Sequence, residues 1–576
     1  MLMPYCKLKE ALGMLKESSR SAVIDGVHDD FDEAKQYLHL EREVEKELRD
    51  LVARVADSQG PKLILLCGNV GDGKSHMITR LRETGPELLE EFAIHNDATE
   101  SSRPDATCID ELRELLAPYK DSNLSDGSQK TLLAINLGTL NNFLVADEEQ
   151  IFSHLREFVD SKKILEAGQI ADNAYREDRP FQFVSFCDHS IFELTAEGPA
   201  SQLIEEALNR VVAESESNPF FNAFCQDCGD EQLRCPIRDN FRMLQRPEVQ
   251  RRISELLIEC IVKHHQIISI RSLYNFVHDV LVPPVLDACD PSTVCDQVKR
   301  MSPEQYLLAS FINGIFEHPE TSDILRYLHA LDPALRRTGS LDEEVVSLMI
   351  KEDRGSLLEQ RDVPLRYISS FSDRKTEDAT AVKTLIRTKY FLDESKEEFG
   401  DDTYKKFMNL IYCWHAGHKH EIKEAYRLVR EAALGWYGLS KRGEMLVELG
   451  NPQLDYRLSG EIRLSPALNP NILQNGTEVV KKFSLVLPFA FSFGKNSHEQ
   501  ILIDYALFEI AHRITRGYRP NHADRSNFVT FCSFVDKIAA DGELDRRLHV
   551  KETESGRRYV LERDEFDEFC FRESER

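Results

Sequence analysis

The sequence has no apolar segment long enough to cross a membrane. Its longest apolar run, FSLVLPFAFSF at residues 483–493, contains Pro488 and is far shorter than the ~20 residues that a transmembrane helix requires. The N-terminal stretch MLMPYCKLKEALGMLKESSR also lacks the continuous apolar core of a secretory leader. These absences predict a cytoplasmic protein without a membrane partner.

Basic side chains are scarce relative to acidic ones. The chain has 72 Lys and Arg against 99 Asp and Glu, which gives a net charge of −27. A protein that binds nucleic acid over its whole surface is usually basic. Any contact with DNA is therefore expected to use a local patch or a partner subunit. We also find no convincing nuclease motif in the sequence.

At 576 residues the chain is too long for a single core, and its patterning divides it into four parts. Residues 1–57 are predicted to form an N-terminal helical segment. Residues 58–290 alternate apolar strands with helices, which predicts an α/β fold: a parallel sheet of the P-loop NTPase type, similar to AAA+ proteins, with a helical lid. Residues 291–440 are predicted to form a helical domain, and residues 441–576 a small mixed α/β domain.

The C-terminal part of the chain combines several patterns. Residues 441–500 alternate polar and apolar side chains as strands do. Helices are expected at residues 499–515 and 524–539. The strongly charged tail at residues 550–576 is expected to be mobile.

A glycine-rich motif, LILLCGNVGDGKSHMITR, lies at residues 63–80. Its large aliphatic residues predict a buried parallel strand, a glycine-rich loop follows, and a helix is expected after the loop. The loop matches the pattern G-x-x-x-x-G-K-S, which binds the phosphates of ATP or GTP. We therefore predict a nucleotide-binding loop formed by Gly68, Asn69, Val70, Gly71, Asp72, Gly73, Lys74, Ser75 and His76.

Each residue type in this pattern has a chemical reason. Gly68 and Gly73 permit positive φ and let backbone N–H groups curl round a phosphate oxygen. The N-terminus of the following helix favours the same anion. Lys74 would reach the β- and γ-phosphates as a catalytic residue, and Ser75 would ligate Mg²⁺. ATP and Mg²⁺ are therefore the expected cofactors.

Hydrolysis also requires a carboxylate that holds Mg²⁺. In many AAA+ ATPases the third strand ends in Asp-Glu, but the third strand expected here, residues 131–137, carries Asn136 instead. We favour Asp188, at the end of the next strand, as the tentative catalytic carboxylate, and Asp97 is another candidate at a strand end. A carboxylate that only caps a turn is an equal alternative.

Two residues are candidates for sensing the γ-phosphate. Asn136 ends the third expected strand, and Arg271 lies in SIRSLYNF, in a helical segment after the sheet. A helical lid would bring such an arginine onto the phosphate. For Arg271, a surface position on an amphipathic helix is the favoured alternative.

Further motifs form an ordered set along the chain: HNDATES, AINLGTLNNF, NPF with CPIRDNF, ISIRSLYNFVHDVLVP, IRTKYF and DYALFEIAHRITRGYRPNHADR. Together with GNVGDGKSH, this set covers most of residues 60–540. It resembles the DptF family, also called DndF, of bacterial DNA phosphorothioation-dependent restriction systems. In those systems one group of proteins marks self DNA with sulfur, and a second group restricts DNA that lacks the mark.

The resemblance implies a role for the whole chain. It would be the ATP-binding and ATP-hydrolysing subunit of a multi-protein complex for phage defence, with the G and H components as partners and DNA contacted through the complex. Residue by residue, the resemblance carries over only to Gly68, Gly73, Lys74 and Ser75. A non-hydrolysing nucleotide-gated scaffold and a P-loop ATPase of another defence or DNA-loading system are the alternatives.

The 13 cysteines are scattered and odd in number, which predicts reduced thiols apart from one cluster. Cys225, Cys228 and Cys235 resemble half of a zinc knuckle, because thiolates two residues apart can hold one metal ion from a tight turn. A fourth ligand is missing from the pattern. The alternatives are therefore a Zn²⁺ site and a reduced cysteine cluster in a surface turn.

A second group of metal-ligand residue types lies in CWHAGHKH at residues 413–420. Its members are Cys413, His415, His418 and His420. Gly417 interrupts the helix that would align these side chains. A polar turn between two helices is the favoured interpretation, and metal binding is the alternative.

Arginines gather in HRITRGYRPNHADR at residues 512–525, an exception in an acidic protein. Arg513, Arg516, Arg519 and Arg525 surround Tyr518. Arginine beside an aromatic ring suits a nucleic-acid backbone with a stacked base, and it also suits an acidic partner surface. A purely structural turn after a helix is favoured over both.

Overall fold

The computed structural model describes residues 5–16, 37–68, 72–96, 107–125, 127–165, 173–186, 189–226, 235–393, 397–438, 443–447, 453–467, 478–493, 497–541, 547–566 and 568–574. The chain divides into two compact units. The first comprises Met1–Glu193 and Pro199–Gly400, and the second Leu194–Gly198 and Asp401–Arg576.

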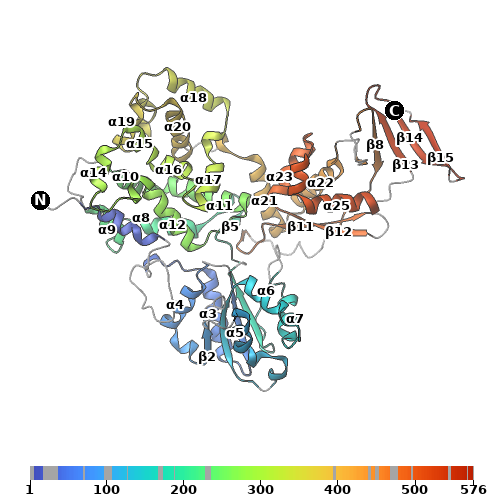
Figure 1. Cartoon of the computed structure of the whole chain (residues 1–576), viewed down its shortest axis with the longest axis horizontal. Coiled ribbons are helices and arrows are strands. Elements are labelled where there is room, and N and C mark those ends of the chain that lie inside the picture. The colour runs from blue at the N-terminus through green and yellow to red at the C-terminus, as the bar shows by residue number, and fades with distance from the viewer. Residues whose placement is uncertain are drawn as a thin grey trace. The chain divides into compact units, whose positions relative to one another are not determined.

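A four-stranded parallel sheet forms the centre of the N-terminal part of the first unit (Figure 1). Its strands are β1 (Lys62–Cys67), β2 (Phe92–His95), β3 (Lys130–Ile135) and β4 (Phe181–Ser185), in the order β2-β3-β1-β4. β1 and β3 are buried along their whole length, as expected for central strands of a sheet covered on both faces. The prediction of an α/β fold with a parallel sheet is confirmed at this level.

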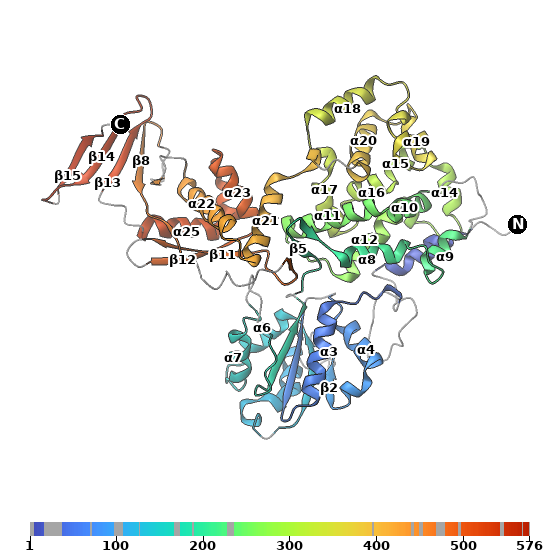
Figure 2. The same cartoon turned by 180° about the vertical axis from the view of Figure 1, so that it is seen from behind.

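Helices cover the two faces of this sheet (Figure 2). One face packs against α3 (Glu43–Ala56) and α4 (Lys74–Thr84) through the side chains of Ile64 and Leu66. The other face packs against α5 (Cys108–Leu115), α6 (Leu137–Val145) and α7 (Ser153–Ser161). The chain leaves β1 through α4 on one face and leaves β3 through α6 on the other. Such a switch point between neighbouring strands opens a crevice at their carboxyl ends.

The remainder of the first unit is mainly helical. Its helices are α1 (Lys7–Leu12), α8 (Gln202–Val212), α9 (Pro219–Cys225), α10 (Pro236–Gln245), α11 (Pro247–His264), α12 (Ile270–Leu281), α13 (Pro284–Asp287), α14 (Val294–Arg300), α15 (Pro303–Leu308), α16 (Phe311–Glu317), α17 (Asp323–Ala330), α18 (Gly339–Ile350), α19 (Leu365–Ser372) and α20 (Asp378–Leu392). Short 3₁₀ helices are η1 (Gly13–Leu15), η2 (Pro86–Leu89), η3 (Ala117–Tyr119), η4 (Asp121–Asn123), η6 (Pro333–Leu335), η7 (Gly355–Leu357), η8 (Glu359–Arg361) and η9 (Glu397–Phe399).

The second unit combines helices with antiparallel strands. Its helices are α21 (Asp402–Ala416), α22 (Lys419–Gly435), α23 (Tyr505–Thr515), α24 (His522–Asn527) and α25 (Val529–Asp541). One sheet has the order β12-β11-β9, from Ser497–Ile503, Leu487–Phe493 and Ser465–Pro466. Another has the order β15-β14-β13-β8-β7, from Phe569–Glu573, Arg558–Arg563, Arg547–Glu552, Tyr456–Glu461 and Glu444–Leu446. A small sheet has the order β10-β5-β6, from Val479–Val480, Glu193–Thr195 and Gly198–Ala200, and the boundaries of the Leu194–Gly198 segment of the second unit fall within β5 and β6.

Two sequence predictions for the C-terminal part are wrong. Residues 497–503 form strand β12, and helix α23 begins only at Tyr505, where the Asp504 carboxylate caps it by accepting from the Leu507 N–H at 2.8 Å. Pairing with β11 over the full length of β12 outweighs the helical pattern there. The charged tail at residues 550–576, which was predicted to be mobile, instead contributes to β13 and forms β14 and β15. Arg547 of β13 forms an ion pair with Glu562 on the neighbouring strand β14, at 2.9 Å.

Among the residues that the structure describes, no helix is both long enough and apolar enough to cross a bilayer.

Candidate nucleotide-binding site

Strand pairing brings three strand ends to the same edge of the parallel sheet. Cys67, the last residue of β1, pairs with Ile135 of β3 on one side and with Ser185 of β4 on the other. The Gly68 N–H then donates to the Ile135 carbonyl at 3.3 Å. The glycine-rich loop therefore starts at the switch point between β1 and β3.

The structure favours glycine at both ends of the loop, at Gly68 and at Gly73. A Cβ atom on Gly68 would lie 2.9 Å from the Asp72 carboxylate and 3.1 Å from the Phe186 side chain. Gly73 has φ of +90° and caps α4 in the left-handed conformation. This conformation is strained for other residues, so the second glycine fixes the turn from the loop into the helix.

The lysine of the pattern turns back onto the loop. Lys74 Nζ donates to the Gly68 carbonyl at 3.0 Å, so the ammonium is held at the start of the loop rather than extended into solvent. Ser75 follows in the first turn of α4 and is half-buried. Asn69, Val70 and Gly71 lie outside the described residues.

Arg42 is a contact of the loop that the sequence analysis missed. This residue precedes α3, and its Nη2 donates to the Asp72 carbonyl at 2.8 Å. Its guanidinium also lies over the Phe186 ring, 4.6 Å from the ring centroid. Burial lowers the pKa of Arg42 to about 10, although the negative charges of Asp72 and Glu45 act to raise it. The side chain therefore remains a cation at neutral pH. The sequence around Arg42 gives no sign of this contact, because the packing of α3 is what brings Arg42 to Asp72.

A polar cluster links α4 to the segment before α3. His76 Nε2 lies 2.9 Å from His39 Nδ1, and His39 Nε2 lies 3.2 Å from the Glu45 carboxylate. Arg80 Nε donates to the same carboxylate at 3.1 Å. Burial lowers the pKa of His76 to about 4, with a smaller contribution from His39. His76 is therefore neutral at physiological pH.

The candidate metal carboxylates lie outside the described residues. This applies to Asp188 and Asp97 alike, so their roles remain predictions. Asn96, directly before Asp97, has a buried Oδ1 without a hydrogen-bond partner at the end of β2. Asn136 is the N-cap of α6, and its Oδ1 accepts from the Thr139 N–H at 2.7 Å. Its amide thus has a structural function at the position where a carboxylate was expected.

Arg271 lies in the first turn of α12. That helix contacts α8, α10 and α16. These contacts place Arg271 in the helical part of the first unit, and its role as a sensor remains a prediction.

The proposed zinc cysteines are described only in part. Cys225 is exposed at the last position of α9, Cys235 is buried at the N-cap of α10, and Cys228 lies outside the described residues. The Zn²⁺ site therefore remains a prediction.

The arginine-rich segment is tied to its own fold. Arg513 lies over the Tyr518 ring at 3.9 Å, and the Tyr518 hydroxyl donates to Asp524 at 2.6 Å. Arg525 lies 5.4 Å from the centroid of the Tyr437 ring. Both arginines are nevertheless exposed. The contacts with tyrosines favour the structural interpretation. The exposure of both arginines is also compatible with binding of a partner.

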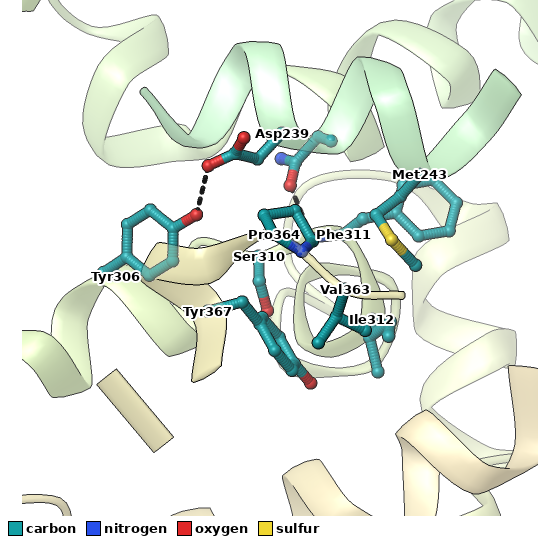
Figure 3. A pocket seen from close by; sticks show the side chains of 10 residues that line it. Asp239, Met243, Tyr306, Ser310, Phe311, Ile312, Val363, Pro364 and Tyr367 are labelled. Atoms are coloured by element: carbon teal, nitrogen blue, oxygen red, sulfur yellow. Dashed lines mark hydrogen bonds between the residues drawn. The ribbon is translucent and has the colours of Figure 1, made fainter. Parts of the chain in front are cut away.

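A pocket in the helical part of the first unit is too small for a nucleotide (Figure 3). It encloses about 10 Å³, close to the minimum for one water molecule, whereas ligand pockets reach several hundred Å³. Tyr306 and Asp239 face each other across it, and the tyrosine hydroxyl donates to the carboxylate. Burial, together with the charge of Asp239, raises the pKa of Tyr306 well above its usual value. The pocket thus contains a stable internal hydrogen bond rather than a reactive group.

Comparisons with protein-family models, with curated proteins and with solved structures found no match for this chain.

Proposed function

We propose that the first unit binds ATP with Mg²⁺ in the loop that joins β1 to α4. The observation that carries this proposal is the combination of Gly68, left-handed Gly73 and inward-turned Lys74 at the switch point of the parallel sheet. Open α/β sheets bind ligands in the crevice at this point. A loop of this composition offers backbone N–H groups and one ammonium to a triphosphate.

Several residues around the loop would each have a separate role in binding ATP and Mg²⁺. The N-terminus of α4 favours the phosphate charge, and Lys74 exchanges its bond to the Gly68 carbonyl for a phosphate oxygen. Arg42 holds the loop backbone through the Asp72 carbonyl. Ser75, a hydroxyl in the first turn, is the residue that would hold Mg²⁺, and the ion would neutralise phosphate charge.

The same proposal places the chain in a DNA phosphorothioation-dependent restriction complex that acts on unmodified DNA. The support is the ordered set of motifs that resembles the DptF family, together with the nucleotide loop. ATP binding and hydrolysis would then serve as a switch or motor for the G and H partners, and DNA would be contacted through the complex.

A non-hydrolysing, nucleotide-gated scaffold is the second candidate function. It is favoured by one observation, the amide of Asn136 at the end of β3, where it caps α6. An amide there cannot supply the negative charge that a Mg²⁺-bound nucleotide requires for hydrolysis. ATP turnover in the presence of partners and DNA separates the two candidates, because only the ATPase releases phosphate.

Replacement of Lys74 tests the nucleotide site. Lys74→Ala is expected to weaken ATP binding by about 10- to 100-fold, because a charge-assisted hydrogen bond contributes about 1.5–3 kcal/mol. The variant should also lose restriction of unmodified DNA. Binding is measured by calorimetry with ATP and Mg²⁺, and restriction by plasmid transformation.

A matched control on the same helix is Arg82→Ala, in the last turn of α4. It should bind ATP as the unchanged protein does. Circular dichroism should show both variants folded, since the Lys74 side chain is only partly buried and lies at the loop. Unchanged ATP affinity in Lys74→Ala would contradict the proposed site.

A further inference from the structure

The turn between α21 and α22 brings together three side chains that ligate metals. Cys413 lies in the last turn of α21, His418 is the N-cap of α22, and Glu421 lies in the first turn of α22. Gly417, with φ of +82°, reverses the chain between the helices. The N–H groups of Gly417 and His418 both donate to the Cys413 carbonyl, the latter at 2.8 Å, so the backbone of the turn is fixed.

The ligand atoms of these three residues converge on one point. The Cys413 Sγ, a His418 ring nitrogen and a Glu421 carboxylate oxygen all lie within 4.8 Å of one another. The distance from Sγ to His418 Nδ1 is 3.9 Å. Tetrahedral zinc, with bonds of about 2.3 Å to sulfur and about 2.0 Å to nitrogen, places such atoms about 3.5 Å apart. Metal binding would therefore require the exposed His418 ring and the Glu421 carboxylate to move slightly toward Cys413.

The fold selects a ligand set that the sequence pattern did not indicate. His415 faces another segment, where its Nε2 accepts from the Ser484 N–H at 3.3 Å. Glu421, which lies on α22 eight residues after Cys413, is the third member of the cluster in place of His415. Among the described residues, the group of Cys413, His418 and Glu421 is the cluster found with metal-binding spacing.

A catalytic thiol is a poor explanation for the same cluster. Cys413 is buried, and burial followed by the charge of Glu421 raises the pKa of its thiol to about 11. A nucleophilic cysteine requires a lowered pKa and access to its substrate. A metal ion, in contrast, deprotonates a coordinating thiol and pairs with the adjacent carboxylate.

We propose that Cys413, His418 and Glu421 bind one Zn²⁺ ion, with water as the fourth ligand. Thiolate and imidazole select zinc over Mg²⁺ and Ca²⁺, which prefer oxygen ligands. Binding releases the thiol proton to solvent and forms the Zn–S bond, without any change of oxidation state. The ion would cross-link the end of α21 and the start of α22. This site is independent of the nucleotide loop in the first unit.

Cobalt(II) is the probe for this site, because a thiolate bound to Co²⁺ gives a charge-transfer band in the near ultraviolet. The full-length protein is stripped with a chelator and titrated with Co²⁺, followed by Zn²⁺ in competition. Cys225→Ser with Cys228→Ser is used as the background, so that the band does not come from that other cysteine cluster. In this background we expect one Co²⁺ per chain with a thiolate band, displaced by Zn²⁺.

Substitution of each ligand then identifies the site. Cys413→Ser should remove the charge-transfer band, and His418→Ala should weaken Co²⁺ binding by more than about tenfold. Glu421→Gln should weaken binding similarly. His420→Ala, an exposed histidine on the same helix, is the control and should bind Co²⁺ unchanged.

Thermal unfolding gives a second readout. Zn²⁺ should raise the unfolding temperature of the background protein and leave that of His418→Ala unchanged, since binding to the folded state alone stabilises it. Because His418 is exposed, this variant is expected to fold even where Cys413→Ser does not. Absence of a thiolate band in the background protein, or equal affinity in His418→Ala, would overturn the proposal.

Discussion

At the scale of single residues, Arg42 shows how a side chain outside the glycine-rich pattern supports it. Its guanidinium binds the Asp72 carbonyl and lies over the Phe186 ring, so it connects the loop with the end of β4. A Cβ atom on Gly73 would lie only 3.1 Å from Arg42 Nη2. The loop backbone and the arginine therefore fit each other closely, and a change in one is expected to shift the other.

Arg42→Ala is expected to weaken ATP binding by about tenfold and to lower the free energy of unfolding by about 1–3 kcal/mol. The physical reason is the loss of a charged donor to the loop backbone. Arg42→Lys keeps the charge but loses the planar stack on Phe186, so an intermediate effect is expected. Calorimetry with ATP and urea unfolding measure the two quantities.

Arg54→Ala is the matched control for Arg42, because Arg54 is exposed in the last turn of α3, the helix that Arg42 precedes. It should leave ATP affinity unchanged. If Arg42→Ala lowers stability yet binds ATP normally, Arg42 serves the fold alone.

At the scale of elements, α3 and α4 are joined by the cluster around His76. The groups that face His76 are His39, Glu45, Arg42 and Arg80. Three of these favour the neutral ring, and Glu45 opposes them. The helix that follows the glycine-rich loop thus carries a histidine that the fold keeps uncharged.

This arrangement predicts a specific loss of stability in acid. The pKa of His76 is about 4 in the folded protein and 6.5 as its ordinary value, so the unfolded chain binds more protons between these values. Stability contributed by neutral His76 is complete above about pH 6.5 and is lost as the pH falls toward 4. The loss from this group is at most about 3 kcal/mol.

His76→Gln should make the free energy of unfolding less dependent on pH over this interval, as measured by urea unfolding at several pH values. His522→Gln, at an exposed position on α24, should keep the original dependence. An identical slope for His76→Gln and the unchanged protein would show that His76 titrates normally in the folded state.

The helical elements of the first unit depend on buried polar groups as well as on apolar packing. Asn240 of α10 donates to the carbonyls of Leu281 at 3.2 Å and Ala309 at 3.1 Å, and its Oδ1 accepts from the Phe311 N–H at 2.7 Å. This residue lies in the motif CPIRDNF. The Asn240 side chain thus connects the end of α12 with the ends of α15 and α16. These hydrogen bonds explain why an asparagine occupies this position of the motif.

Arg387 of α20, in the motif IRTKYF, has the same kind of function. The guanidinium is buried, forms two bonds to Asp332 at 3.1 and 2.6 Å, and binds Glu317 at 2.7 Å. Arg387→Met is expected to lower the free energy of unfolding by about 3–5 kcal/mol, because buried Asp332 would lose its charge partner.

Urea unfolding measures this effect. Arg326→Met, which removes an exposed pair with Asp323, is the control and should cost less than about 1 kcal/mol. A similar small effect for Arg387→Met would mean that Asp332 is reached by solvent or becomes protonated at little cost.

At the scale of the whole molecule, the net charge of −27 limits what the chain can do alone. Non-specific DNA binding normally arises from Lys and Arg that neutralise phosphates. The described arginines at residues 512–525 are a local exception, and two of them stack on tyrosines of the same unit. The proposed role on DNA is therefore expected to require partner subunits.

The isolated chain should bind ATP but should neither cut DNA nor bind it tightly. Addition of the partners should raise ATP turnover, because a neighbouring subunit can complete a nucleotide site with a charged residue in trans. Asp188→Asn should abolish this gain if Asp188 holds the metal. ATPase and DNA-nicking assays, on the chain alone and with its partners, measure these outcomes.

Asp160→Asn, at an exposed position on α7, is the matched control and should retain the full gain. DNA cleavage by the isolated chain would overturn the prediction. A normal gain in Asp188→Asn would assign the metal carboxylate to Asp97 or elsewhere.

The sequence by itself determined the parts that rest on short-range patterns. Apolar runs identified β1 and β3 as buried strands, and the spacing of Gly68, Gly73 and Lys74 indicated the loop, because strand burial and loop conformation depend on adjacent residues. The same reasoning failed at residues 499–503, where pairing with β11 decides the conformation.

Only the tertiary structure decided the contacts between residues that are distant along the chain. Arg42 binds a carbonyl 30 residues away, and Arg387 reaches an aspartate 55 residues away. Glu421, rather than His415 or His420, completes the cluster at the α21–α22 turn, because the direction of each side chain is set by how the helices pack. Local sequence carries no record of such packing, since the free energy that selects it comes from burial shared between separate elements.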